Sequence, residues 1–389
     1  MQYSKITDKE NRVTAEISEF RVENGISEYQ LIIHVTQTGL SFVKQLEAIL
    51  SLYKRICKKE LTGATVAFCR FFFSDIANQY PSLLHILSKE EQTCASFIEQ
   101  PPLNGTKIAL WAYLMKETGT HIPITEKSHE PEIHEVQHGR YSHLRTNTKL
   151  YPDGNSEQQM SKILCHYIEL LKEHNCTLRD NCIRTWIFVK DVDLNYTGIV
   201  KARRDIFMNN GLTEKTHFIA STGINGNSYE QEGLVMFDAY AINGIRKEQI
   251  QYLHAKTHLN STYEYGVTFE RGTCIHYGDR RHVFISGTAS INNKGEIEHV
   301  GDIEKQTMRM IENVEALLKE AECGFEDVAQ MIIYLRDMAD YQTTKTIADQ
   351  QFPEIPKIIV LASVCRPGWL IEMECIAIKQ DKNEKFEPL

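Results

Sequence analysis

Residues 365–378 read Cys365-Arg366-Pro367-Gly368-Trp369-Leu370-Ile371-Glu372-Met373-Glu374-Cys375-Ile376-Ala377-Ile378. The Pro-Gly pair predicts a turn, because proline fixes φ and lacks an N–H donor while glycine accepts turn geometry. The following residues predict a β-strand, in which alternate side chains share a face. Glu372 and Glu374 then lie among apolar neighbours on one face. A carboxyl group held against apolar surface has a raised pKa and can donate a proton near neutral pH. The ordinary alternative is a half-exposed strand with solvated glutamates, since charged side chains are rarely buried.

The composition is that of a globular protein with ample core material, with 389 residues, 42% hydrophobic and 24% charged. This length predicts two or three domains. The formal net charge of −9 comes without a basic block, which argues against nucleic acid or an acidic membrane surface as a partner. A small carboxylate stays a candidate ligand, because a local arginine cluster can bind it inside an acidic protein. No run of about 18 apolar residues predicts a membrane span.

The ten cysteines form no Cys-x-x-Cys pair, and their spacing fits no zinc pattern. Most lie in apolar runs, as buried free thiols do, so we expect a protein of the reducing cytoplasm. A polar segment at 116–150 holds five histidines, but their irregular spacing predicts no metal site. Nor does any glycine-rich nucleotide motif occur, so we expect no cofactor. These histidines are His121, His129, His134, His138 and His143.

One order of elements occurs three times: a strand-rich start, a helix, a strand, a helix and two closing strands. The clearest copy has strands at 283–291 and 328–335, a helix after the N-cap residue Asp302, a helix at 340–350, and closing strands at 358–364 and 370–378. The middle copy has a helix after Gly154, a strand at 183–189, a helix near 198–210, and closing segments at 218–223 and 234–242. A fainter first copy has helices near 41–57 and 78–88 and strands at 65–73 and 108–115.

This alternation predicts an α+β fold of repeated units, each a mixed β-sheet with helices packed on one face. Three such units in one chain predict a pseudo-trimeric arrangement and a monomer, because the linked copies already satisfy trimer-like contacts. We expect a divergent unit at 1–120, a linker at 121–150, a second unit at 151–245, and a C-terminal domain at 246–389 that carries the active site.

The aligned closing strands single out one glutamate. Glu372 aligns with Met236 in the second copy and with Ala109 in the first, so the third copy alone has a carboxylate at this position. Glu374 has Asp238 as its counterpart in the second copy. We therefore assign the proton to Glu372 and a structural role to Glu374, and we expect one active site per chain, where two copies meet.

Two family resemblances follow from these residues. The C-terminal part resembles the Rid/YjgF family, an α+β fold that forms trimers with sites between subunits, through the motifs YLRDM, SGTAS and IEMECIAI at 334–338, 286–290 and 371–378. Residues 180–378 resemble more closely the chorismatases, single chains of Rid-like units that cleave chorismate to pyruvate and a ring product. The carrying pieces are RTWIF at 184–188, FIASTG at 218–223, YG at 265–266, FERG at 269–272, SGTASI at 286–291, HVGD at 299–302, Tyr334 with Arg336-Asp337, and Cys365-Arg366 with Glu372.

The chorismatase resemblance implies that Glu372 is the catalytic acid. In this family, Gly after the Phe-x-Arg motif and Cys before the final strand go with the 3-hydroxybenzoate-forming type, whereas Ala at these points goes with the hydrolytic type. Here these residues are Gly272 and Cys365, so the resemblance implies 3-hydroxybenzoate as the ring product. Gly272 would leave room for a ring pose, and Cys365 would either assist the ring-side step or only shape the site.

Chorismate carries two carboxylates, which need cations or amides. Arg271 and Arg366 are the first candidates because the arginine fork suits carboxylates, and Arg203 or Arg204 would reach across from the second copy. Tyr334 would bind a ring hydroxyl, and small residues around Gly287 would let a ligand approach backbone N–H groups.

Two alternatives remain open: a Rid-type enamine/imine deaminase and a non-catalytic protein that binds a small metabolite. Rid deaminases carry an arginine before the penultimate strand to hold the substrate carboxylate. That place falls at or near Lys357, and lysine lacks the rigid bidentate fork, which weakens the deaminase hypothesis.

Overall fold

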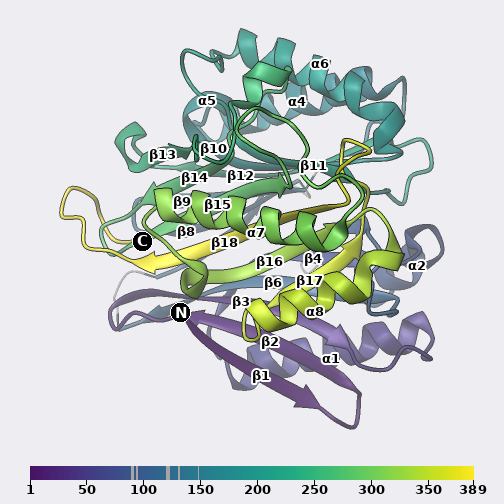
Figure 1. Ribbon diagram of the computed structural model, residues 1–389. Coiled ribbons are helices and arrows are strands. Elements are labelled where there is room, and N and C mark those ends of the chain that lie inside the picture. The colour runs from purple at the N-terminus through teal and green to yellow at the C-terminus, as the bar shows by residue number, and fades with distance from the viewer. Residues whose placement is uncertain (89–91, 93–94, 120–122, 130–131, 148) are drawn as a thin grey trace.

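The computed structural model describes residues 1–88, 92, 95–119, 123–129, 132–147 and 149–389. Within them the chain forms three six-stranded mixed β-sheets with helices on their outer faces (Figure 1). Each sheet comes from one continuous part of the chain, and we name these parts the first unit (2–118), the second unit (125–243) and the third unit (250–380). The predicted α+β fold of three repeated units in a pseudo-trimeric arrangement is confirmed.

The first unit has the strand order β1-β2-β3-β6-β4-β5. Only β4 and β5 pair in parallel, so the sheet is mixed. Its elements are β1 (Gln2–Asp8), β2 (Val13–Phe20), β3 (Gly25–Val35), α1 (Phe42–Lys59), β4 (Thr65–Phe73), α2 (Ile76–Leu84), β5 (Ala95–Glu99) and β6 (Ile108–Thr118).

The second and third units repeat this topology, with orders β11-β10-β12-β9-β8-β7 and β13-β14-β15-β18-β16-β17. The second unit contains β7 (Thr125–His129), β8 (Ile133–His138), β9 (Tyr141–Asn147), α4 (Ser156–Glu173), α5 (Leu178–Asn181), β10 (Cys182–Val189), α6 (Val192–Asn209), β11 (Ala220–Asn225) and β12 (Val235–Asn243). The third contains β13 (Ile250–Leu253), β14 (Gly272–His276), β15 (Arg280–Ala289), α7 (Ile303–Glu320), β16 (Val328–Leu335), α8 (Tyr341–Gln351), β17 (Lys357–Leu361) and β18 (Ile371–Gln380).

The prediction of a linker at 121–150 is wrong, because β7, β8 and β9 lie there and extend the second sheet through the β9–β12 pairing. Polar side chains of β8 and β9 are buried, and they find partners in the first unit and on β12 of their own unit. His134 Nε2 lies 2.8 Å from the Val66 carbonyl oxygen, and His143 Nδ1 lies 2.6 Å from the Tyr240 hydroxyl. His138 is also buried, whereas His121 lies outside the described residues and the side chain of His129 is not described.

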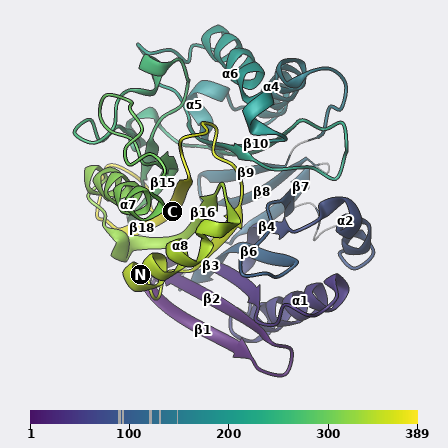
Figure 2. The ribbon, with the colours of Figure 1, turned by 45° about the vertical axis from the view of Figure 1, so that its right-hand side comes forward.

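The three sheets turn their helix-free faces toward one another, and the helices lie at the periphery (Figure 2). Buried ion pairs in this interior tie the units together in pairs. Arg70 Nη2 lies 2.7 Å from Asp238 Oδ2, Arg184 Nη2 lies 2.8 Å from Glu374 Oε2, and Arg280 Nη1 lies 2.6 Å from Glu28 Oε1. Each unit therefore contacts both others through charge as well as through apolar packing. Among the described residues, no helix is long and apolar enough to cross a membrane.

Candidate functional site

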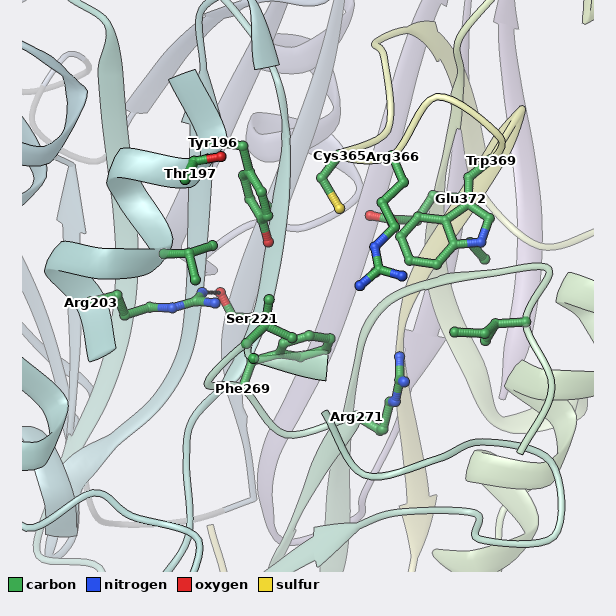
Figure 3. A pocket seen from close by; sticks show the side chains of 17 residues that line it. Tyr196, Thr197, Arg203, Ser221, Phe269, Arg271, Cys365, Arg366, Trp369 and Glu372 are labelled. Carbon is green, nitrogen blue, oxygen red and sulfur yellow. Dashed lines mark hydrogen bonds between the residues drawn. The ribbon is translucent and has the colours of Figure 1, made fainter. Parts of the chain in front are cut away.

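A cavity of about 210 Å³ lies between the second and third units (Figure 3). The main chains of the two units meet beside it: Glu270 N–H donates to the Ile219 carbonyl at 3.0 Å, and Asn225 N–H donates to the Ser363 carbonyl at 3.0 Å. These bonds fix the two loops of the third unit against β11. The lining residues are Tyr196, Thr197, Val200, Arg203, Ser221 and Gly223 from the second unit, and Gly266, Val267, Phe269, Arg271, Gly287, Ala289, Ile291, Cys365, Arg366, Trp369 and Glu372 from the third.

The predicted Pro-Gly turn leads directly into this cavity. Buried Gln306, in the first turns of α7, holds the turn from both sides: its Nε2 donates to the Gly368 carbonyl at 3.0 Å, and its Oε1 accepts the Leu370 N–H at 3.0 Å. The helix itself begins where the sequence predicts, since Asp302 accepts the Lys305 N–H at 3.1 Å. The segment between β17 and β18 is therefore anchored to a helix.

Glu372 lies on β18 with 5% of its surface exposed. The pKa of its carboxyl group is raised to about 8, mainly by burial and then by the charge of Glu374, while Arg184 and Arg271 oppose the shift. The carboxyl group makes no hydrogen bond to the described residues and borders the cavity. Glu372 is consequently protonated at neutral pH and free to give its proton to a ligand.

Gly287 on β15 supports this carboxyl group. A Cβ atom at position 287 would collide with Glu372 Oε1 and would come within 2.7 Å of its carboxyl carbon. Any side chain there would push the acid aside, so glycine is required by close approach rather than by backbone conformation.

Three arginines reach the cavity from both units. Arg203 on α6 donates to Thr268 Oγ1 at 3.2 Å and to Ser221 Oγ at 3.4 Å. Arg271 donates to Asn260 at 3.2 and 3.3 Å, and the guanidinium of Arg366 lies over the Trp369 ring at 5.1 Å. Such a set can bind carboxylate groups on opposite sides of a small ligand. The structure also separates the two candidates of the second unit, because Arg203 lines the cavity whereas the Arg204 side chain is 52% exposed.

Cys365 and Tyr196 face each other across the cavity (Figure 3). Burial raises the pKa of the Cys365 thiol to about 12, and a hydrogen bond from Tyr196 opposes the shift only in part. Cys365 is thus a neutral thiol and not a thiolate nucleophile. Sequence reasoning missed Tyr196; the available signal was its spacing of seven residues from Arg203, which places both on one face of a helix.

Two predicted site residues lie outside the cavity. Gly272 opens no room in the cavity, because a Cβ there would press on the Phe284 carbonyl oxygen at 3.0 Å and on Leu253 at 3.1 Å, neither of which lines the cavity. Tyr334 pairs with Glu372 in the β16–β18 register but is fully buried, and burial raises the pKa of its hydroxyl well above the usual value. It therefore has no opening through which to bind a ring hydroxyl.

A counterpart cavity of about 590 Å³ lies between the third and first units, where β17 and α8 face β2 and β3. Lys357 lines this second cavity, and the sheet register gives it Ser221 as counterpart in the Glu372 cavity. Ala109 pairs with Phe72 in the first sheet as Glu372 pairs with Tyr334 in the third, so Ala109 is the counterpart of Glu372. The acid and Lys357 therefore belong to different cavities, and Ser221 stands in the Glu372 cavity at the position of that lysine.

Comparisons with known proteins agree with this architecture. Residues 274–379 match the family model described as endoribonuclease L-PSP. A RutC family protein of Pyrococcus abyssi is 38% identical over 101 residues, which cover 25% of this chain and 79% of the relative. The 3-aminoacrylate deaminase RutC of Acinetobacter baylyi is 31% identical over 97 residues, covering 24% of this chain and 77% of the relative.

The chain belongs to the RutC family. The family model matches within the third unit, which confirms the predicted Rid/YjgF resemblance of the C-terminal part. The crystal structure of a chorismatase superposes with a TM-score of 0.61 at 15% identity, over 80% of this chain and 93% of that one. All three units of this RutC family member are thus arranged in a fold shared with a chorismatase.

Proposed function

We propose that the protein is a chorismatase that converts chorismate to 3-hydroxybenzoate and pyruvate. The observation that carries the proposal is Glu372, a neutral carboxylic acid without a hydrogen-bond partner among the described residues, in a cavity with three arginines. An enol ether is cleaved through protonation of carbon, which needs an acid that stays protonated at neutral pH. A dianionic substrate needs cations around it, and Arg203, Arg271 and Arg366 supply them from two sides.

In this mechanism Glu372 transfers its proton to the methylene carbon of the enol-pyruvyl ether. The electron pair of the C=C bond forms the new C–H bond, and an oxocarbenium ion remains. The Glu372 carboxylate produced faces that cation, and nearby Arg184 and Arg271 favour its ionised form. The ring carbon–oxygen bond then breaks, its electron pair completes the ketone of pyruvate, and pyruvate leaves a ring cation behind. The hydroxyl oxygen of the adjacent ring carbon moves to the vacated carbon, and loss of the hydrogen there as a proton to the Glu372 carboxylate makes the ring aromatic and restores the acid. The two products together contain the atoms of chorismate, so no net water is consumed on the path to 3-hydroxybenzoate.

The proposal of 3-hydroxybenzoate as the ring product rests on Cys365. Its neutral thiol lines the cavity, where it shapes the ring-side wall or donates a weak hydrogen bond, and Tyr196 supports it from α6. Gly272 lies outside the cavity wall, so its part in the ring chemistry would be indirect, through the neighbouring Arg271.

A Rid-type deaminase is the second candidate, and the RutC family match favours it. Against it stands Ser221, which occupies the place beside Glu372 where a deaminase would hold the substrate carboxylate. A metabolite-binding protein without catalysis is the third candidate.

The deciding experiment follows pyruvate release from chorismate with a coupled lactate dehydrogenase assay, and identifies the ring product by chromatography and NMR. We expect equal amounts of pyruvate and 3-hydroxybenzoate, and loss of both with Glu372→Gln. A dihydrodiol as sole ring product would overturn the product assignment but keep the chorismatase. Ammonia release from an imino acid without pyruvate release from chorismate would establish the deaminase instead.

A further inference from the structure

Glu374 lies two residues beyond Glu372 on the same face of β18, with 2% of its surface exposed. Its carboxyl group accepts hydrogen bonds from three side chains of the second unit. Arg184 Nη2 donates to Oε2 at 2.8 Å, Trp186 Nε1 donates to Oε1 at 2.7 Å, and the Thr222 hydroxyl donates to Oε2. Three donors, one of them cationic, favour an ionised carboxylate even in a buried place.

Thr222 connects this carboxylate to the support of the acid. Its Oγ1 accepts the Gly287 N–H at 2.9 Å while its hydroxyl donates to Glu374. At Gly287 the Glu372 carboxyl group occupies the place that a Cβ atom would take. Thr222 therefore holds both the Glu374 carboxylate and the backbone at Gly287, against which the Glu372 carboxyl group packs.

The charged groups that act on Glu372 come from several elements. Glu374 on β18 disfavours its ionisation, and Arg184 on β10 and Arg271 before β14 favour it. Tyr334 on β16 is paired with it in register, and Cys365 and Arg366 approach from the loop before β18. Two carboxyl groups on strand residues whose Cα atoms are about 7 Å apart resist double ionisation in a dry environment, so the one with three donors takes the charge.

The second unit provides a natural comparison. Asp238 on β12 is the counterpart of Glu374 and forms a buried pair with Arg70 of the first unit at 2.7 Å. Two residues before Asp238, however, Met236 stands where Glu372 stands in the third unit. A buried inter-unit ion pair therefore occurs at this strand position with and without an acid beside it.

We propose that Glu374 is a positioning residue that acts through Glu372: its buried charge, fixed across the unit boundary by Arg184, Trp186 and Thr222, acts together with burial to keep the acid in its protonated form. This inference rests on the proposed function for its catalytic meaning, and it replaces the purely structural role assigned from the sequence. It makes the contact between the second and third units part of the acid–base machinery.

The test compares Glu374→Gln with Asp238→Asn, each removing one buried carboxylate of the same strand position. Turnover of chorismate is measured against pH for both. We expect the alkaline limb of the Glu374→Gln profile to move down by about one pH unit or more, because the like charge two residues along the strand is gone. Asp238→Asn is expected to keep the wild-type midpoint of the alkaline limb, even where it lowers stability. Glu374→Asp keeps the charge, and its midpoint is expected to lie close to that of the wild type.

A second measurement needs no activity, and it uses a variant only to assign the resonances. With ¹³C-labelled glutamate, the carboxyl resonances of the wild-type protein at pH 7 are expected to show a protonated Glu372 and an ionised Glu374, assigned with Glu372→Gln. An ionised Glu372 or a protonated Glu374 would overturn the inference. So would a Glu374→Gln profile identical to that of Asp238→Asn. Failure to turn over chorismate, with the expected resonances present, would overturn the proposed function alone.

Discussion

At the level of single residues, Glu372 combines a functional gain with a cost in stability. Its pKa is about 8 in the folded protein against 4.5 for the ordinary side chain. Between these two pH values the folded state therefore holds a proton that the unfolded chain has already lost. The free energy of unfolding consequently falls as the pH rises through this range. Such a cost is typical of an acid kept neutral for proton transfer.

Glu372→Gln should therefore abolish turnover and raise stability at alkaline pH. Glutamine cannot ionise, so relative to the variant the wild type loses stability of the order of a few kcal/mol between about pH 5 and pH 9. Urea unfolding of both proteins at these two pH values measures the difference. Equal stability differences at both pH values would contradict the raised pKa of Glu372.

Gly287→Ala tests the close approach of β15 to the acid. The added methyl group would overlap the Glu372 carboxyl group and press on Thr222 at 3.1 Å, so we expect turnover to fall about 100-fold, as for a displaced catalytic group. Gly39→Ala is the matched control, because a Cβ at position 39 meets no atom within 4 Å. A fully active Gly287→Ala enzyme would show that the acid tolerates displacement.

At the level of elements, α6 brings the second unit into the site. Arg203 from this helix is buried at the cavity, whereas Arg204 points to solvent beside Asp205. We expect Arg203→Ala to raise KM for chorismate about tenfold or more, through loss of a charge-assisted contact to a carboxylate, and Arg204→Ala to leave KM within about twofold. Steady-state kinetics of the pair, with folding checked by circular dichroism, measures this. Equal effects of both substitutions would remove Arg203 from substrate binding.

Many elements could be predicted from the sequence, because long apolar runs determine them: the strands expected at 65–73 and 328–335 coincide with β4 and β16. The strands β7 to β9 could not, since residues such as Ser142, His143 and Arg145 are polar and nothing in the sequence shows that the structure buries them. The sequence alone likewise does not give the register across a unit boundary. Six of the eight predicted site residues nevertheless line one cavity, and Gly272 and Tyr334 do not.

At the level of the whole molecule, the asymmetry among the units explains why one cavity holds the acid. The cavity between the third and first units has a closing strand with Ala109 in place of the acid, and Lys357, one of the lysines that line it, lies 3.4 Å from Asp349. Linking three units in one chain allows such divergence, whereas identical subunits would carry identical boundaries.

The same arrangement leads us to expect a monomer. The sheets of the three units bury their inner faces against one another, and ion pairs such as Arg280–Glu28 close the contact between the third and first units. The contact faces that a separate subunit would need are therefore already occupied. Light scattering coupled to size exclusion is expected to give a mass near 44.8 kDa at all concentrations. A mass that rises to a multiple of this value with concentration would show that a further surface, outside the inner faces, mediates assembly.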